Sequence, residues 1–168
     1  MIVGLCASAS DTIPFSSGEV AVRGGGLWPI GSLSRIFDPT AQVGASLAMS
    51  HWGDVRSRLD LSYARLEGRD ELHYLLGGAG FDWRPARLPL EAGASLGLFF
   101  VQDDPNPDKP RLTDGGETEF GLVLRLGAPV WTRGPWTLRA EAQWQEAFTA
   151  PRASALAWTG LSLSRRAW

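Results

Sequence analysis

The sequence lacks long apolar runs, and it has one lysine and one cysteine among its 168 residues. No stretch free of charged residues reaches the roughly 18 apolar residues of a transmembrane helix, which excludes helical membrane spans. The 16 cationic residues are offset by 18 acidic ones to a net charge of −2, so there is no strong positive field for nucleic acid. The 20 glycines are spread through the apolar segments, which argues against a helical bundle. An all-β chain remains.

The first nine residues form a short apolar segment that ends in Ala7-Ser8-Ala9. This small-x-small pattern is typical of a signal-peptidase site. We therefore expect residues 1–9 to be a truncated signal peptide, with an accidental match as the alternative, and residues 10–168 to form one domain. Cleavage after Ala9 would remove Cys6, the only thiol, and with it any disulfide, thiolate metal site or cysteine catalysis.

Alternation of apolar with polar or small residues dominates the chain from Glu19 onward. This period of two is that of a strand with two unlike faces. Strands with their connections take about 20 residues each, so a chain of this length fits eight and cannot reach the 16 of a porin. The eight expected segments are residues 19–28, 43–50, 58–63, 72–83, 90–100, 119–126, 136–144 and 155–165.

The composition of the two faces indicates which one points inward. A soluble barrel would fill its interior with large apolar side chains and carry long polar residues outside. Here the polar face consists of Gly, Ser and Ala with scattered charges, and small residues suit the crowded inside of a tightly curved sheet. The apolar face carries Leu, Val, Phe and Trp, which can contact acyl chains. We therefore predict an all-β, eight-stranded antiparallel up-and-down transmembrane β-barrel, since only a closed sheet satisfies its backbone in lipid.

The connections and the tryptophans distinguish the two ends of this barrel. Compact connections at residues 53–55, 84–88 and 127–134 alternate with longer, more polar ones at residues 29–40 and 102–116. If the chain starts on the inner side, the long connections lie on the outer side. Four tryptophans near segment ends are in phase with the apolar face and are expected to form two aromatic girdles. These are Trp28 and Trp144 at the outer end, and Trp83 and Trp136 at the inner end.

The first third of the chain contains GGGLWPIGSLSRIFDPTAQVGASLAM, and the last residue is Trp168. The Gly-rich strand, Pro-x-Gly turn and returning Gly-rich strand resemble those of small outer-membrane β-barrel proteins of Gram-negative bacteria, such as outer-membrane proteins A and X. The chain departs from that family in LSLSRRAW, which breaks the alternation after Leu163. The resemblance implies a fold, a bacterial outer-membrane location and recognition of the C-terminal strand by the barrel-assembly machinery. It implies no activity.

Charged residues of the polar face are expected to lie inside the barrel. A narrow eight-stranded interior has room for side chains and little else, and an unpaired buried charge is costly. We therefore predict an ionic network that closes the lumen, with a gated ion or proton path as the alternative. Its expected members are Arg23, Arg58, Asp60, Glu91, Glu119, Arg125, Arg139 and Glu141, with Glu19 in the same phase.

The two histidines, His51 and His73, are the only starting points for a serine–histidine site. His73 is expected to face outward near the outer end of its strand, where lipopolysaccharide would be met. However, Leu75 stands where outer-membrane deacylases carry the serine of a His-x-Ser motif, and Ser50 points to the opposite face from His51. We predict an interfacial, non-catalytic role for both histidines and no catalytic residues.

Two further motifs are weak. Residues 104–108 (DPNPD) have the alternate acidic spacing of a calcium loop, but Lys109 stands where that loop needs glycine. A solvated acidic loop is expected there, with no metal and no cofactor; weak divalent binding is the alternative. Residues 26–28 (GLW) match the Gly-x-Trp of lipocalins, which leaves a soluble ligand carrier as another alternative.

The function predicted from these patterns is that of a structural or interaction scaffold and not of an enzyme. The outer connections, residues 29–40 and 102–116, would meet outer-membrane lipid, lipopolysaccharide or an unidentified protein partner, and no nucleic acid. A lipid A-modifying enzyme, a narrow channel and the soluble carrier are the competing functions.

Overall fold

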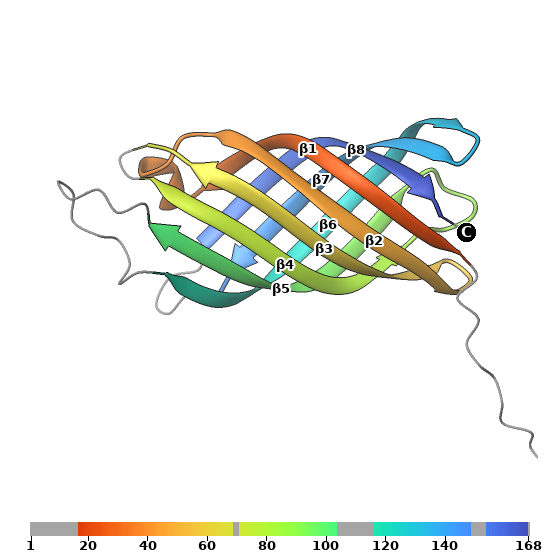
Figure 1. The fold of residues 1–168 in the computed structure, drawn as a ribbon, viewed down its shortest axis with the longest axis horizontal. Helices are drawn as coiled ribbons and strands as arrows, with labels where there is room; N and C mark the ends of the chain where they lie inside the picture. The colour runs from red at the N-terminus through yellow and green to blue at the C-terminus, as the bar shows by residue number, and fades with distance from the viewer. Residues whose placement is uncertain (1–16, 69–70, 104–115, 149–153, 168) are drawn as a thin grey trace, which may run out of the picture.

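Eight antiparallel strands form a closed barrel in sequence order, with β1 pairing to β8 (Figure 1). The computed structural model describes residues 17–68, 71–103, 116–148 and 154–167. A single turn of 3-10 helix, η1 (Leu33–Arg35), lies between β1 and β2. The strands are β1 (Gly18–Ile30), β2 (Thr40–Trp52), β3 (Val55–Leu66), β4 (Leu72–Trp83), β5 (Glu91–Asp103), β6 (Glu117–Arg133), β7 (Trp136–Ala147) and β8 (Ser154–Arg166). The predicted fold class is confirmed, whereas the proposed signal peptide at residues 1–9 lies outside the described residues.

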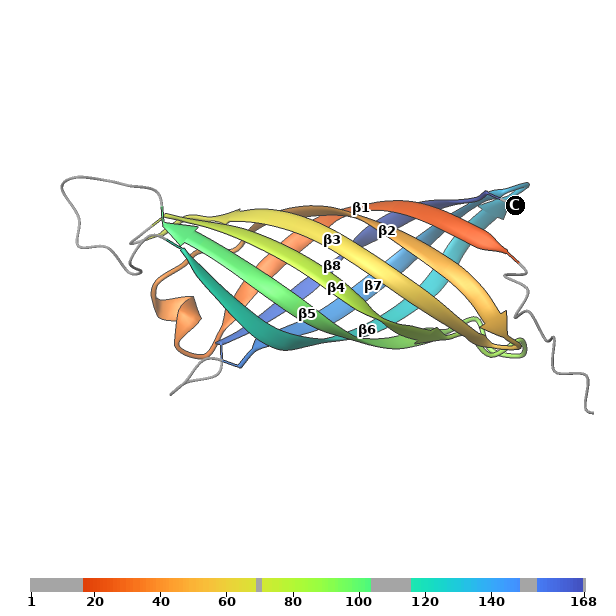
Figure 2. The ribbon, with the colours of Figure 1, turned by 60° about the horizontal axis from the view of Figure 1, so that its bottom comes forward.

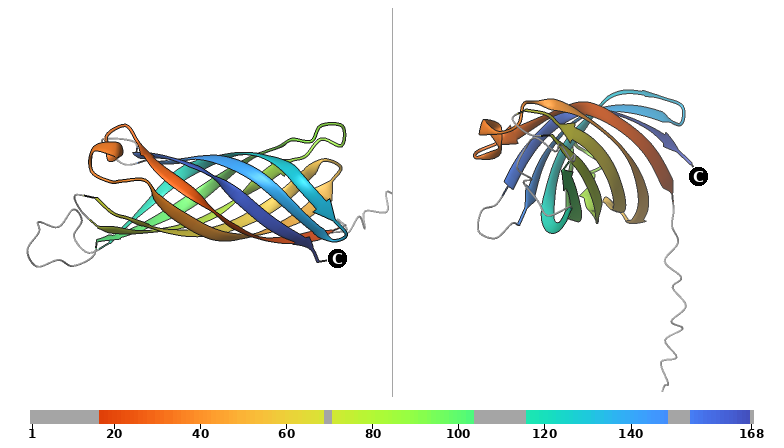
Figure 3. Two further views of the ribbon diagram at one scale, coloured as in Figure 1. Left: turned by 90° about the horizontal axis from the view of Figure 1, so that it is seen from above. Right: turned by 60° about the vertical axis from the view of Figure 1, so that its left-hand side comes forward.

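The barrel has two unlike ends, and the C-terminus lies at one of them (Figures 2 and 3). This inner end carries the β2–β3, β4–β5 and β6–β7 turns, and Gly53 and Gly134 adopt positive φ angles of 52° and 58° in two of them. The opposite, outer end carries η1, which lies between β1 and β2. The predicted long connection at residues 102–116 falls largely on residues that the structure does not describe.

Two strands run further than the sequence pattern suggested. Residues 127–134 were expected to be a compact connection, but β6 continues to Arg133, which pairs with Trp136. A register shift between Pro129 and Trp131 explains this, because a bulge accommodates a proline that cannot donate to the ladder. The end of β8 also lies beyond the point where the apolar alternation breaks, after Leu163, because Arg165 takes the next outward position. Strand β8 continues to Arg166, with Ser162 and Ser164 buried.

Large apolar side chains cover the outside of the barrel. Val22, Leu61, Leu96, Phe120 and Leu126 are each more than half exposed, although such residues are normally buried. The buried inward side chains include charged and small polar residues, among them Arg58, Asp60 and Ser162. This distribution matches a lipid-facing exterior and a polar interior. Among the described residues, no helix is long and apolar enough to cross a membrane.

Candidate functional site

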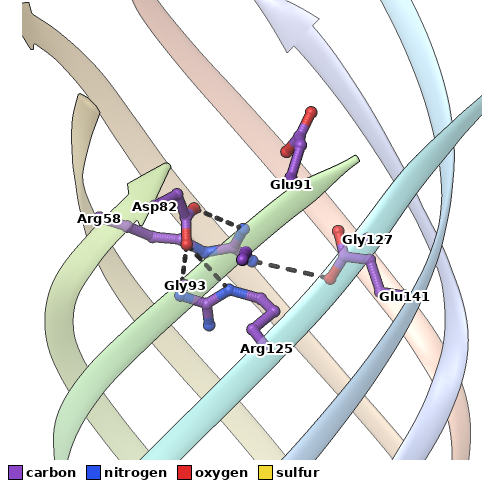
Figure 4. A pocket seen from close by; sticks show the side chains of 8 residues that line it. Arg58, Asp82, Glu91, Gly93, Arg125, Gly127 and Glu141 are labelled. Atoms are coloured by element: carbon purple, nitrogen blue, oxygen red, sulfur yellow. Dashed lines mark hydrogen bonds and ion pairs between the residues drawn. The ribbon is translucent and has the colours of Figure 1, made fainter. Parts of the chain in front are cut away.

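Charged side chains from five strands meet in the inner half of the lumen. The Asp60 carboxylate accepts hydrogen bonds from three arginines at N–O distances of 2.9, 2.8 and 3.1 Å. Asp82 accepts bonds from two of these arginines at 3.3 and 2.9 Å, and Glu141 lies 3.9 Å from the nearest one. Three positive charges thus face three negative ones, and every side chain is almost fully buried. The members of this deep ionic layer are Arg23, Arg58, Asp60, Asp82, Arg125 and Glu141, of which Figure 4 labels four.

Two glycines make room for these ion pairs. Asp82, Gly93 and Arg125 lie side by side in the register of β4, β5 and β6, so the Asp82–Arg125 pair spans the middle strand (Figure 4). A Cβ on Gly93 would collide with the Asp82 carboxylate. A Cβ on Gly44 would likewise meet the Arg23 guanidinium, which crosses β2 to reach β3. These two small residues of the polar face therefore leave the space in which long charged side chains cross a strand.

A second group of charges, the rim ionic layer, lies at the inner end. Arg139 pairs with Glu91 at 2.9 Å and also with Glu19. Glu19 accepts a further hydrogen bond from Arg56, and Glu91 forms an ion pair with Arg84, both at 3.0 Å. Arg84 lies just beyond β4, where partial burial lowers the pKa of its guanidinium and attraction to Glu91 opposes that shift. These side chains reach up to 30% exposure, so this layer is wetter than the deep one.

The structure brings seven of the eight residues predicted for the lumen network into these two layers. Glu119 is the exception. It points inward as its phase requires, but it lies near the outer end of β6, away from both layers, and no ion pair joins it to a described residue. The sequence reasoning missed Asp82, Arg56 and Arg84. The first two are in phase with inward neighbours on their own strands, and that signal could have identified them.

A layer of amides lies above the ions. Tyr74 donates its hydroxyl to Gln145 at 2.9 Å, and the Gln145 amide donates to Gln42 and Gln143, both at 3.1 Å. Gln42 donates in turn to Ser62 at 3.3 Å. Hydrogen bonds between uncharged side chains therefore separate the ionic inner half of the lumen from its outer half.

The outer half of the lumen is apolar. Leu27, Leu76, Phe99 and Trp158 are at most 1% exposed there. Trp158 is out of phase with the girdle positions because it points inward, with its ring 5.8 Å from the Arg23 guanidinium carbon. Above this cluster lies a cavity of about 220 Å³, which we call the outer basin. It is lined by Leu33, Ile36, Phe37, Leu66, Leu72, Tyr74, Phe99, Val101, Glu117, Glu119, Ala147 and Leu156.

The four predicted girdle tryptophans lie on the outer surface near the barrel ends. Trp28 and Trp144 flank the same residue of β8 in register near the outer end. Trp83 ends β4 and Trp136 begins β7, so both lie at the inner end. Each is between 38% and 51% exposed.

The two histidines lie at opposite ends of the barrel. His73 Nδ1 is 2.7 Å from the Tyr63 hydroxyl on the outward face, and the two rings stack. His51 Nε2 is 2.7 Å from the hydroxyl of Ser57, a contact the sequence reasoning missed because Ser57 belongs to the neighbouring strand. Among the described residues, no group of three or more His, Cys, Asp or Glu side chains could hold a metal ion. The acidic segment 104–108 lies outside those residues.

No protein-family model and no curated protein matches the sequence, but solved structures match the fold. Neisserial surface protein A superimposes with a TM-score of 0.68 at 14% identity, covering 88% of this chain and 96% of that one. The fold is that of a small outer-membrane β-barrel. The Yersinia pestis outer membrane protein Ail (TM-score 0.54, 10% identity, coverage 89% and 99%) and the N-terminal β-barrel domain of Pseudomonas aeruginosa OprF (0.52, 15%, 87% and 96%) are also similar. This barrel therefore has the predicted family resemblance in its fold, and the neighbours agree with the predicted outer-membrane location.

Proposed function

We propose that this protein is an outer-membrane scaffold, a barrel with a closed lumen that holds its outer end at the cell surface. The observation that supports this most is the deep ionic layer. Its six charges come from β1, β3, β4, β6 and β7 and balance one another across the lumen. The cavity beside them has a volume of about 10 Å³, roughly the least that holds one water. Ions crossing this level would have to displace buried, paired charges, which is costly.

Conductance in planar lipid bilayers tests the closed lumen against a narrow channel. We expect no conductance steps from the wild-type barrel. The double variant Arg125→Ala with Asp82→Ala removes one cation and one anion that span β5, so it should produce steps. A matched control is Arg65→Ala, which removes two ion pairs of a half-exposed arginine at the outer end. Steps from the wild-type barrel that resemble those of the double variant would refute the scaffold and favour the channel.

The proposed role includes no catalysis. His73 contacts a tyrosine rather than a serine, and the His51–Ser57 pair lies at the inner end, away from lipopolysaccharide in the outer leaflet. The lipid A of cells that express the wild type, His73→Ala or His51→Ala should have the same mass. A mass change that depends on either histidine would replace the scaffold with a lipid A-modifying enzyme.

Insertion into the outer membrane is the basis of this proposal. Boiled and unboiled samples of the outer-membrane fraction should migrate differently on a gel, because a closed barrel resists unfolding until it is heated. A soluble protein without this shift would favour a lipocalin-like ligand carrier. Lipopolysaccharide and a protein partner remain the proposed contacts of the outer end, and the assembly machinery the proposed contact of β8.

A further inference from the structure

The outer basin differs from the rest of the lumen in both chemistry and packing. The interior of a transmembrane barrel is ordinarily polar, yet ten of the twelve residues that line the basin are Leu, Ile, Val, Phe, Ala or Tyr. A void lined by apolar groups forfeits the dispersion contacts that its walls could make. The basin exceeds the roughly 150 Å³ cavity that binds benzene. It therefore has the size and lining of a site for a small apolar body.

Side chains from the barrel strands and from the η1 segment surround the basin. The ring centroids of Tyr74 and Phe99 lie 5.7 Å apart at the side of the basin that faces the inner end. The Tyr74 hydroxyl donates a hydrogen bond to Gln145 of the amide layer. Leu33, Ile36 and Phe37, from η1 and the residues after it, also line the basin. An isolated bridge between Phe37 and Gly68 joins the η1 segment to the residues that follow β3. Water from the inner end is thus separated from the basin by the amides and the ions.

The two polar lining groups other than Tyr74 carry the same charge. Glu117 and Glu119 are two residues apart on β6 and share its inward face. No arginine or lysine is among the described residues that line the basin, and neither glutamate has an ion pair with a described residue. At the same end, by contrast, Glu67 and Glu71 both form ion pairs with Arg65. Among the described residues, the basin therefore combines an apolar wall with two carboxylates that have no cationic partner.

We propose that the outer basin binds an apolar amine, a molecule with a ring or short alkyl body and one cationic nitrogen. The body fills the cavity against Leu33, Ile36 and Phe37, and the ammonium donates hydrogen bonds to the carboxylates of Glu117 and Glu119. Charge-assisted bonds of this kind are about twice as strong as neutral ones. Apolar anions are rejected because the two carboxylates repel them. This inference goes beyond the scaffold proposal and requires only a folded barrel.

Three probes of one shape separate the apolar and the charged part of the proposal. They are 2-phenylethylamine, 2-phenylethanol and 3-phenylpropanoate, titrated into the barrel in lipid nanodiscs at neutral pH. The chain has four isoleucines, of which the structure describes Ile30 and Ile36. Their δ1-methyl NMR signals give two reporters. Ile36 lines the basin, whereas Ile30 alternates outward at the end of β1 and senses the probe that dissolves in lipid.

We expect the amine to shift the Ile36 signal saturably, with an affinity about tenfold above that of the alcohol, and the carboxylate probe to leave that signal unchanged. The double variant Glu117→Gln with Glu119→Gln should lower amine affinity to that of the alcohol without affecting the alcohol. Glu146→Gln is the matched control, because Glu146 is the outward-facing neighbour of Ala147 and bonds to Trp144. It should change nothing.

Three outcomes would overturn the proposal. Shifts of Ile30 without a saturable shift of Ile36 would mean that the probes partition into lipid and the basin is not a site. Equal binding of amine and alcohol would remove the role of the carboxylates. An equal loss of amine affinity in Glu146→Gln would attribute the preference to general attraction at the barrel mouth. None of these results bears on conductance, so the scaffold proposal stands or fails separately.

Discussion

The inner and outer halves of this lumen are filled by opposite chemistry. The inner half contains eleven charged side chains in two layers, six cationic and five anionic. The outer half contains Leu27, Leu76, Phe99 and Trp158, almost fully buried, and then the outer basin. The cavity beside the deep ionic layer has a volume of about 10 Å³, while the outer basin has a volume of about 220 Å³. The ion pairs of the deep ionic layer, which are directional contacts, therefore close the lumen more tightly than the apolar contacts around the outer basin do.

The physical reason lies in what each kind of contact requires. A buried charge needs a partner at a fixed distance, because an uncompensated one is strongly destabilising. Arginines can meet that need across several strands, since the guanidinium offers five donors on a long stem. Apolar contacts are individually weak and have no preferred direction, so a void among them is tolerated. The two halves should therefore respond differently to the same kind of substitution.

Removal of Arg125 should be the most damaging change. Arg125 binds Asp60 and Asp82 with a side chain only 4% exposed, so Arg125→Ala leaves two buried carboxylates short of a partner. We expect a loss of about 3 kcal/mol in the free energy of unfolding, measured by urea denaturation in lipid vesicles. Arg65→Ala serves as the control, because exposed pairs contribute at most about 1 kcal/mol. Equal losses in the two variants would mean that the deep ionic layer does not stabilise the inner half.

A single methyl group at Gly93 should be the next most damaging. Gly93→Ala places a Cβ against the Asp82 carboxylate and must displace the ion pair that passes over β5. We expect a loss of about 2 kcal/mol, within the range for overpacking. Gly93 and Gly127 both line the small cavity beside the deep ionic layer. A Cβ added at Gly127 would make ordinary contacts with Glu141 and Ala140, so Gly127→Ala should be nearly neutral. If the two alanine variants lose the same stability, strand propensity explains the loss, and a steric conflict with the Asp82–Arg125 ion pair does not.

Alternation along the chain was enough to predict the barrel, its strand number and the inward direction of most charges. The alternation predicts whether a side chain points inward or outward, but it does not predict the position of that side chain along the barrel axis. For this reason Glu119 was grouped with residues such as Arg125 from the inner half. That position depends on which strand end a residue lies near, and β6 runs from the outer end inward. The rim pairing of Arg84 was missed for another reason. Arg84 belongs to a turn, where a period of two has no meaning, and it reaches Glu91 from outside the strand.

The outer basin could not be predicted from the sequence either. Its walls combine inward positions at the outer ends of β3 to β8 with η1, a short helix in a connection. Leu66, Leu72 and Val101 each look like an ordinary end of an alternating segment. Only the closed register brings them to one level, and only then does the apolar composition of that level become visible.

Filling the outer basin should have the smallest effect and the opposite sign. Ala147 is 7% exposed and lines the cavity, so Ala147→Leu adds apolar atoms where there is room for them. We expect a gain of about 1 kcal/mol, measured by the same urea denaturation, because buried methylene groups contribute about 0.8 kcal/mol each. Ser62→Leu, at the opposite side of the amide layer, should destabilise the barrel because Ser62 accepts from Gln42 in a fully buried position. A loss of stability in both variants would mean that the outer half is packed as tightly as the inner half, and the contrast between the two would no longer hold. A gain in Ala147→Leu alone would show that the outer half carries unused volume, at a cost in stability that the inner half does not bear.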